Sequence, residues 1–238
     1  MKQFDKYSKE QVQFYDGTAP KLLIDLIKTR NPKSLADLGC GDGAILFHLQ
    51  QKGLLKKNDC VVAIDLSETR LERVKKYIAN VKTICCDVCD VKQLKDNKFD
   101  VVISTAVIEH VENDGKLLKE IYRVFKSGGY LYISSVVKKW YGWWIYTCNG
   151  KITCDPTHLR EYKSSEEFNK LLKYNKFKIG ETHVYQFTPS LKNAFKRLMV
   201  KYNIISENNA RSTKKFDFFS NIRIHVPGYC VIEVIARK

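Results

Sequence analysis

The chain is poor in several features that mark whole classes of protein. Only 5 prolines and 12 glycines occur in 238 residues, which excludes collagen-like and low-complexity chains. No segment approaches the roughly 18 uninterrupted apolar residues that a transmembrane helix requires. The first residues, Met1–Gln11, lack the apolar core of a signal peptide. These absences predict a soluble, cytoplasmic protein.

The composition is that of a folded globular protein. About 44% of the residues are hydrophobic and 28% are charged, which is enough to bury a sizeable core. The length suits one large domain or two small ones. Because no linker separates an independent unit, we expect residues 1–238 to form a single domain.

Positive charge is in excess and unevenly distributed. Lys and Arg number 41 against 26 Asp and Glu, a net charge of +15, and Lys139–Lys238 carries +10 of it. Such a field attracts nucleic acid, an anionic membrane surface or an acidic substrate. A solvated basic surface explains the same excess equally well.

Cysteine is plentiful, with eight residues in a chain that shows no secretion signal. This combination indicates free thiols in a reducing compartment. Cys86 and Cys89 have CxxC spacing, but a structural zinc site needs a second pair, and Cys148 and Cys154 are poorly spaced for one. We therefore predict no metal site.

Short apolar runs alternate with amphipathic segments of about 12 residues, which is typical of an α/β protein with a parallel sheet covered on both faces. The crossover rule then predicts a doubly wound arrangement. The expected strands are Ser34–Leu38, Cys60–Leu66, Lys82–Val88, Phe99–Ser104, Tyr130–Val136, Lys178–Phe187 and Tyr229–Ala236. The expected helices are Lys9–Arg30, Ala44–Gln51, Ser67–Asn80, Asp114–Lys126, Ser164–Tyr174 and Pro189–Ile205.

Two segments interrupt this rhythm. Three tryptophans crowd Trp140–Trp144, where they either line an acceptor pocket or pack in a local core. The Pro189–Ile205 pattern places apolar residues such as Phe195 on one face and includes the basic residues Lys192 and Lys196. Such a helix packs on its own domain, covers a site as a lid, or lies on a membrane surface.

The most informative segment is the glycine-rich stretch Asp37–Gly43, between a predicted strand and a predicted helix. Glycine permits positive φ and lets a ligand approach bare backbone. Asp65 closes the next strand, where a carboxylate can accept hydrogen bonds from a ribose diol. The loop also satisfies the dinucleotide pattern GxGxxG/A, which is weak evidence by itself.

Two further acids distinguish the candidate cofactors. Asp37 lies within the strand, where it would repel a pyrophosphate but suits a ligand that carries an amino group and a sulfonium. Asp87 ends the third strand, where it suits an adenine amino group. Together with Asp65, these acids favour S-adenosylmethionine over NAD.

Five segments resemble the class I, Rossmann-like S-adenosylmethionine-dependent methyltransferases, especially the small-molecule group of methyltransferase type 11 domains that includes the ubiquinone and menaquinone methyltransferases. They are Leu35–Gly43, Val61–Glu68, Cys86–Val88, Phe99–Val111 and Ile121–Ser134. They occur in the family's order and spacing, and the combination is more specific than any one segment.

The resemblance implies a seven-stranded, mostly parallel sheet whose last strand, Tyr229–Ala236, is antiparallel. It implies a cofactor-binding core over about residues 15–137, an aromatic insertion at 138–163 and a helical insertion at 188–227 that cover the substrate. The cofactor-binding residues would be Tyr15, Asp37, Gly39, Cys40, Gly41, Asp65, Leu66, Asp87, Val88 and Ser104.

Methyl transfer from a sulfonium is an in-line displacement, so the protein aligns the acceptor and, for a hydroxyl acceptor, removes a proton. His110 follows the fourth strand at the mouth of the cofactor site and is the first candidate base. His158 and Tyr162 lie in a D-x-x-H-x-x-x-[FY] segment that resembles the substrate-covering connection of many small-molecule members. A structural role is an equal alternative for each histidine.

The leading hypothesis is methyl transfer to a small-molecule acceptor, with S-adenosylhomocysteine as the product. Oxygen is favoured as the acceptor atom, and nitrogen and carbon stay open as alternatives. A quinone-like, lipid-like or sugar-derived acceptor fits the aromatic insertion. The alternatives are an RNA or protein methyltransferase that uses the basic C-terminal part, and a non-catalytic binding protein. Nucleic acid and a membrane surface are therefore secondary candidate partners, and the sequence predicts no oligomeric state.

Overall fold

The computed structural model describes residues 15, 18–56, 60–144, 146–148, 150–202, 204–206, 209–210, 222 and 224–238. A seven-stranded sheet forms its centre, in the order β3 (Val81–Cys85), β2 (Cys60–Asp65), β1 (Ser34–Leu38), β4 (Phe99–Thr105), β5 (Phe125–Lys138), β9 (Tyr229–Arg237) and β8 (Lys178–Gln186). β9 pairs antiparallel with both β5 and β8, and the other neighbouring strands pair in parallel. The predicted seven-stranded, mostly parallel sheet is confirmed.

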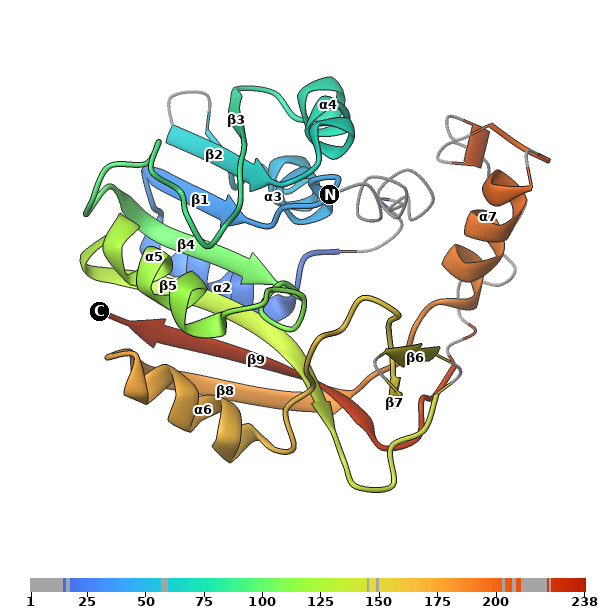
Figure 1. Ribbon diagram of the computed structural model, residues 1–238. Helices are drawn as coiled ribbons and strands as arrows, with labels where there is room; N and C mark the ends of the chain where they lie inside the picture. The colour runs from blue at the N-terminus through green and yellow to red at the C-terminus, as the bar shows by residue number, and fades with distance from the viewer. Residues whose placement is uncertain are drawn as a thin grey trace.

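Helices cover both faces of the sheet (Figure 1). One face is covered by α2 (Lys21–Arg30), α3 (Ala44–Gln51) and α4 (Glu68–Tyr77). Their apolar residues form one core with strand residues such as Leu35 and Val61. α5 (Asp114–Val124) and α6 (Ser165–Tyr174) pack on the other face, against residues such as Ala36 and Val62. Successive strand residues therefore serve opposite cores, which explains why all five residues of β1 are buried.

Several element boundaries differ from those expected. The predicted helix Lys9–Arg30 is helical only over α2, residues 18–20 are not helical, and residues 9–14 and 16–17 lie outside the described part. α5 stops at Val124 and the chain enters β5 directly. Two helices begin at a serine cap: the Ser67 hydroxyl accepts the Arg70 N–H and the Ser164 hydroxyl accepts the Glu167 N–H.

The two insertions lie beyond the carboxyl ends of the parallel strands (Figure 1). The aromatic insertion contains an unpredicted hairpin of β6 (Tyr146–Cys148) and β7 (Lys151–Thr153). The helical insertion contains α7 (Leu191–Lys201), which stands apart from the sheet (Figure 1). No helix in the described part of the chain is long and apolar enough to cross a bilayer.

α7 leaves part of its apolar stripe exposed, although Val200 packs beside Ala210. Phe195, Leu198 and Tyr202 are exposed, whereas Lys192 and Lys196 are buried. The tryptophans of the aromatic insertion also differ in burial. Trp144 packs against a small core, but Trp140 is 94% exposed. Core packing therefore does not account for Leu198, Tyr202 or Trp140.

Candidate active site at the carboxyl edge of the sheet

The glycine-rich loop joins β1 to α3 and leaves backbone uncovered where side chains would not fit. Gly39 and Gly43 have φ of +79° and +80°. A Cβ on Gly39 would lie 2.3 Å from Cγ2 of Val107, and a Cβ on Gly43 would lie 2.6 Å from Cδ1 of Ile78. Both positions therefore require glycine for conformation and for space.

Asp37 is the most unusual group at this edge. Its side chain is fully buried, and neither carboxylate oxygen has a hydrogen-bond partner among the described residues. Burial, followed by the negative charge of Asp65, raises the pKa of Asp37 to about 8. Because an unpartnered buried carboxylate is costly, the site fits a ligand that brings a cation or hydrogen-bond donors to it.

Asp65 is held at the tip of β2 by backbone donors. Its Oδ2 accepts the Gly41 N–H and its Oδ1 accepts the Ser67 N–H, each at 2.9 Å. Burial raises the pKa of Asp65 even though these hydrogen bonds oppose the shift. Each oxygen keeps a further lone pair, so the fixed carboxylate can still accept from a pair of ligand hydroxyls.

The tips of β2 and β3 lie side by side, as the Cys86 N–H donates to the Asp65 carbonyl at 3.2 Å. Asp87 follows β3 rather than ending it; it is exposed, and its Oδ1 accepts the Cys89 N–H at 2.8 Å. Leu66 is also exposed, whereas Val88 is buried. This arrangement leaves Asp87 and Leu66 available to a ligand beside Asp65.

The remaining predicted cofactor residues surround the same loop. Cys40 is buried, and burial raises its pKa well above the ordinary value, which makes it a neutral packing residue. Ser104, near the end of β4, is buried, and its hydroxyl has no hydrogen-bond partner among the described residues. The Tyr15 hydroxyl donates to the Asp42 carbonyl at 2.6 Å, and the Tyr15 ring stacks on Phe47 at 4.3 Å.

Asp42 is a loop residue that sequence reasoning missed. Its side chain is fully buried. Its Oδ1 forms ion pairs with the guanidinium of Arg73 at 3.2 Å and with Nε of Arg70 at 3.9 Å. The two arginines lie one turn apart on α4, so they fasten this helix to the glycine-rich loop. The i, i+3 spacing of Arg70 and Arg73 indicates that both side chains lie on one face of α4. Nothing local in the sequence identifies Asp42 as their partner.

A second group of polar residues lies next to the loop. Val107, which contacts the Gly39 position, accepts the His110 N–H through its carbonyl at 2.9 Å. The His110 ring meets the Thr157 hydroxyl at 2.9 Å and the Thr157 carbonyl at 3.3 Å, both through Nδ1. The Thr157 hydroxyl donates to Asp155 at 2.6 Å.

These contacts determine the tautomer of His110. A carbonyl only accepts, and the single Thr157 hydroxyl proton is given to Asp155, so Nδ1 of His110 carries the proton. Nε2 then keeps a lone pair. Burial, and then the neighbouring His158, lower the pKa of His110 to about 4. The ring is therefore neutral near pH 7 and can accept a proton through Nε2.

His158 lies between two glutamates. Its Nδ1 is 3.0 Å from Oε1 of Glu161, its Nε2 is 4.0 Å from Oε1 of Glu109, and its ring centroid is 4.7 Å from that of His110. Burial raises the pKa of Glu109. Burial acts to raise the pKa of Glu161, but hydrogen bonds from His158 and the Cys154 N–H outweigh it, so this pKa is lowered. Sequence reasoning singled out His158 but missed both glutamates.

Arg160 connects this group to the loop that follows β4. Its guanidinium donates to the carbonyls of Ile108 at 2.9 Å, Val111 at 2.6 Å and Glu112 at 2.7 Å. The Leu159 N–H adds a bond to the Glu109 carbonyl at 2.9 Å. The segment that carries Thr157 and His158 is therefore fastened over the loop that carries His110.

Tyr162 is placed differently from the histidines. It lies in the core beside β5 and α6, in edge contact with Phe168, and burial raises the pKa of its phenol. Donor atoms of Glu109, His110 and His158, and of Cys154, His158 and Glu161, lie within 4.8 Å of one another. The absence of a metal therefore stays a prediction.

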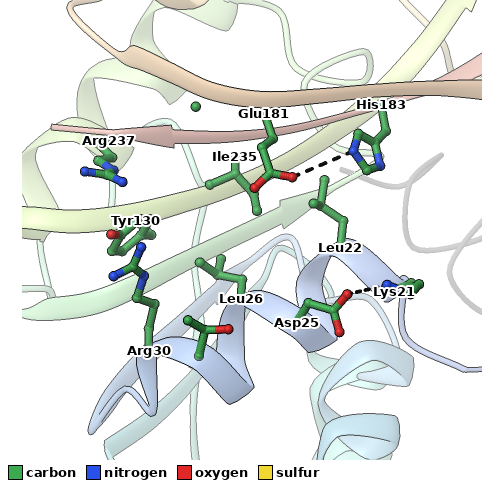
Figure 2. Close-up of a pocket in the computed structure, with 12 residues that line it drawn as sticks. Lys21, Leu22, Asp25, Leu26, Arg30, Tyr130, Glu181, His183, Ile235 and Arg237 are labelled. Atoms are coloured by element: carbon green, nitrogen blue, oxygen red, sulfur yellow. Dashed lines mark hydrogen bonds and ion pairs between the residues drawn. The ribbon is translucent and has the colours of Figure 1, made fainter.

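A separate cavity of about 350 Å³ lies between α2 and the β8–β9 edge (Figure 2). Leu26, Arg30, Tyr130, Glu181 and His183 are among the residues that line it. None of the predicted site residues contributes to it. This cavity is therefore distinct from the strand-end site.

Residues 36–133 match the family model described as a methyltransferase domain. This segment contains the end of β1, the glycine-rich loop, Asp65, Asp87, Ser104 and His110. Residues 36–133 are thus a methyltransferase domain. The match covers the strands whose carboxyl ends form the site just described.

The curated relatives of the methyltransferase domain share about a quarter to a third of the aligned residues. A ubiquinone biosynthesis O-methyltransferase of Bartonella quintana is 27% identical over 50% of this chain and 47% of its own length. A malonyl-[acyl-carrier protein] O-methyltransferase of Marinomonas is 29% identical over 59% and 56%. The chain therefore spans about half the length of these relatives.

Solved structures share the fold of the chain at lower identity. A SAM-dependent methyltransferase of Methanosarcina mazei has a TM-score of 0.61 at 16% identity and covers 92% of this chain and 98% of its own. Phosphoethanolamine N-methyltransferase 2 of Haemonchus contortus, in complex with S-adenosyl-L-methionine, has a TM-score of 0.57 at 22% identity, over 90% and 51%. The class I fold extends beyond the methyltransferase domain into β8 and β9.

Proposed function

We propose that the protein transfers a methyl group from S-adenosylmethionine to a small-molecule acceptor. The observation that carries this proposal is the buried Asp37 carboxylate without a described partner, beside a bare glycine loop and the fixed carboxylate of Asp65. A cationic nucleoside complements both acids, whereas a dinucleotide would bring a pyrophosphate to Asp37. The family match and the named cofactor of the Haemonchus structure support the same choice.

Each strand tip would hold one part of the cofactor. Asp37 and the backbone of Gly39 and Gly41 would bind the charged amino-acid part, and Asp65 would accept from the ribose hydroxyls. Leu66, Asp87 and Val88 would surround the adenine. When bound, the cofactor supplies an electrophilic methyl group on sulfur, so the protein's remaining task is to place and deprotonate the acceptor.

His110 is the proposed proton acceptor. Its Nε2 lone pair is available because Thr157 holds the proton on Nδ1. A base with a pKa of about 4 stays unprotonated over the physiological range and takes the proton as the acceptor oxygen loses its electrons to the new bond. We give His158 a positioning role against Glu109 and Glu161, and we give Tyr162 no direct role.

Oxygen is the favoured acceptor atom. Both curated relatives described above are named as O-methyltransferases, and the buried polar group around His110 suits a hydroxyl that must be deprotonated. Quinone-like, lipid-like and sugar-derived hydroxyls remain within the proposal. RNA or protein methylation rests on the basic C-terminal part alone, so it is the second candidate.

The test is a calorimetric titration of the full chain with S-adenosylmethionine, S-adenosylhomocysteine and NAD. We expect both sulfur nucleosides to bind, and Asp65→Ala to weaken them at least about tenfold through loss of its hydrogen bonds. Asp25→Asn, which removes an exposed charge on α2, is the matched control. Binding of NAD in place of the sulfur nucleosides would overturn the proposal.

A panel of quinols, catechols, hydroxylated lipids and sugars, assayed for S-adenosylhomocysteine formation, then identifies the acceptor class. Turnover with RNA or a protein substrate in place of every small molecule would favour the second candidate.

A further inference from the structure

Exposed apolar side chains are concentrated in the two insertions. Of the fourteen large apolar residues that are exposed in the described part of the chain, ten lie in residues 138–163 and 188–227. They are Trp140, Tyr141, Trp143, Tyr146, Leu159, Phe195, Leu198, Tyr202, Ile204 and Ile222. Single exposed apolar residues are ordinary on a protein surface, but a concentration of this kind marks an interaction surface.

The α7 contribution has a consistent geometry. Phe195 and Leu198 are three residues apart and lie on one face of α7, and Tyr202 follows at the C-cap of the helix. This face is exposed, while Lys192 and Lys196 on the same helix are buried. Leu198 and Tyr202 are 49% and 67% exposed, so they offer an apolar surface to a partner.

The aromatic insertion supplies a second apolar element on the same side of the molecule. Trp140, Tyr141 and Trp143 follow β5, and Figure 1 shows both insertions beyond the carboxyl ends of the parallel strands. Tryptophan and tyrosine are the residues enriched at the interface between lipid and water, because their rings have an apolar body and a polar edge.

Charge identifies the kind of partner. Residues 138–163 and 188–227 contain 13 Lys and Arg against 4 Asp and Glu. Without the buried Lys192 and Lys196 the balance is 11 against 4, a net charge of +7. Lys139, Lys151 and Lys163 are exposed. An apolar surface within a basic field suits a bilayer with anionic headgroups, where apolar insertion and electrostatic attraction add. A neutral protein partner would not require the charge, and nucleic acid would not require the outward α7 face.

We propose that the described parts of the two insertions form a peripheral membrane-binding surface, with Trp140, Trp143, Leu198 and Tyr202 entering the interface of an anionic bilayer. The surface lies on the side of the molecule where the strand-end site opens, so a membrane-held acceptor would reach that site without leaving the lipid. Binding to the bilayer does not depend on methyl transfer, so the two proposals fail separately.

The test is co-sedimentation of the full chain with vesicles of phosphatidylcholine alone and with phosphatidylglycerol added. We expect binding to the anionic vesicles, a blue shift of tryptophan emission, and weaker binding as salt is raised. The double variant Trp140→Ala/Trp143→Ala and the variant Leu198→Ser should each reduce partitioning by roughly tenfold through loss of inserted apolar area.

Tyr174→Ala is the matched control. Tyr174 is 88% exposed, comparable to Trp140, but it lies at the end of α6, outside both insertions. It should leave partitioning unchanged. Failure to bind anionic vesicles at low salt, an equal loss in all three variants, or preferential binding to RNA over vesicles would each overturn the proposal. Circular dichroism of each variant confirms that the comparison is made on folded protein.

Discussion

Asp37→Asn should stabilise the ligand-free protein and weaken its cofactor binding at the same time. Asn has nearly the same shape as Asp but carries no charge. In the folded protein the pKa of Asp37 is raised to about 8 from an ordinary value of 3.8. Between these values the unfolded chain holds the ionised acid and the folded chain the protonated one, so folding takes up a proton.

The direction of the effect follows from this linkage. Because the unfolded state binds fewer protons, the stability of the unmodified protein falls as the pH rises from about 4 to about 8. Each pH unit in this range costs about 1.4 kcal/mol at most. From pH 5 to pH 8 the stability gained by Asp37→Asn should therefore grow by a few kcal/mol. The slope is independent of any fixed cost of the buried amide.

Urea unfolding of both proteins at several pH values measures this slope. S-adenosylmethionine binding supplies the complementary measurement: the affinity of the unmodified protein should rise roughly tenfold per unit between pH 6 and 7 and level off above pH 8, as a cation displaces the Asp37 proton. In Asp37→Asn the affinity should be weaker and this rise absent. Parallel stability curves for the two proteins would refute the reasoning.

Three further predictions concern the second polar group. His110→Ala should lower turnover by roughly 10²-fold or more, with little change in cofactor affinity. In the unmodified enzyme, a pH–rate profile should show that protonation of His110 reduces kcat only near pH 4. Thr157→Val should lower kcat roughly tenfold by releasing the Nδ1 proton, with recovery in Thr157→Ser; equal rates in both would exclude the tautomer argument. Arg160→Ala should cost roughly 1 kcal/mol in urea unfolding, because the partly buried Ile108 and Val111 carbonyls lose their donor. Arg160→Lys should recover part of this loss, and an unchanged midpoint would contradict the role assigned to Arg160.

The sheet was predictable because its information is local. Apolar runs of strand length, the glycines of the β1–α3 loop and the caps Ser67 and Ser164 each act within a few residues, and together they determine the order of the elements. The three acids were predictable for the same reason, since each lies at or near the carboxyl end of a recognisable strand.

The polar group and the insertions required the folded structure. Thr157 meets His110 across 47 residues of sequence, and no local pattern selects that pair. Strands of three residues such as β6 and β7 are too short to produce a clear alternation. The periodicity of α7 showed an amphipathic helix, but it did not show which face is buried, because that depends on what the helix packs against.

The proposed function requires a sulfur nucleoside to bind at the carboxyl ends of β1, β2 and β4. A crystal structure of the chain with S-adenosylhomocysteine tests it most directly. We expect density along Gly39 and Gly41, with the ribose on Asp65 and an amino group at Asp37. Density in the cavity between α2 and β8, or anywhere that leaves Asp37 and Asp65 without contact, would contradict it.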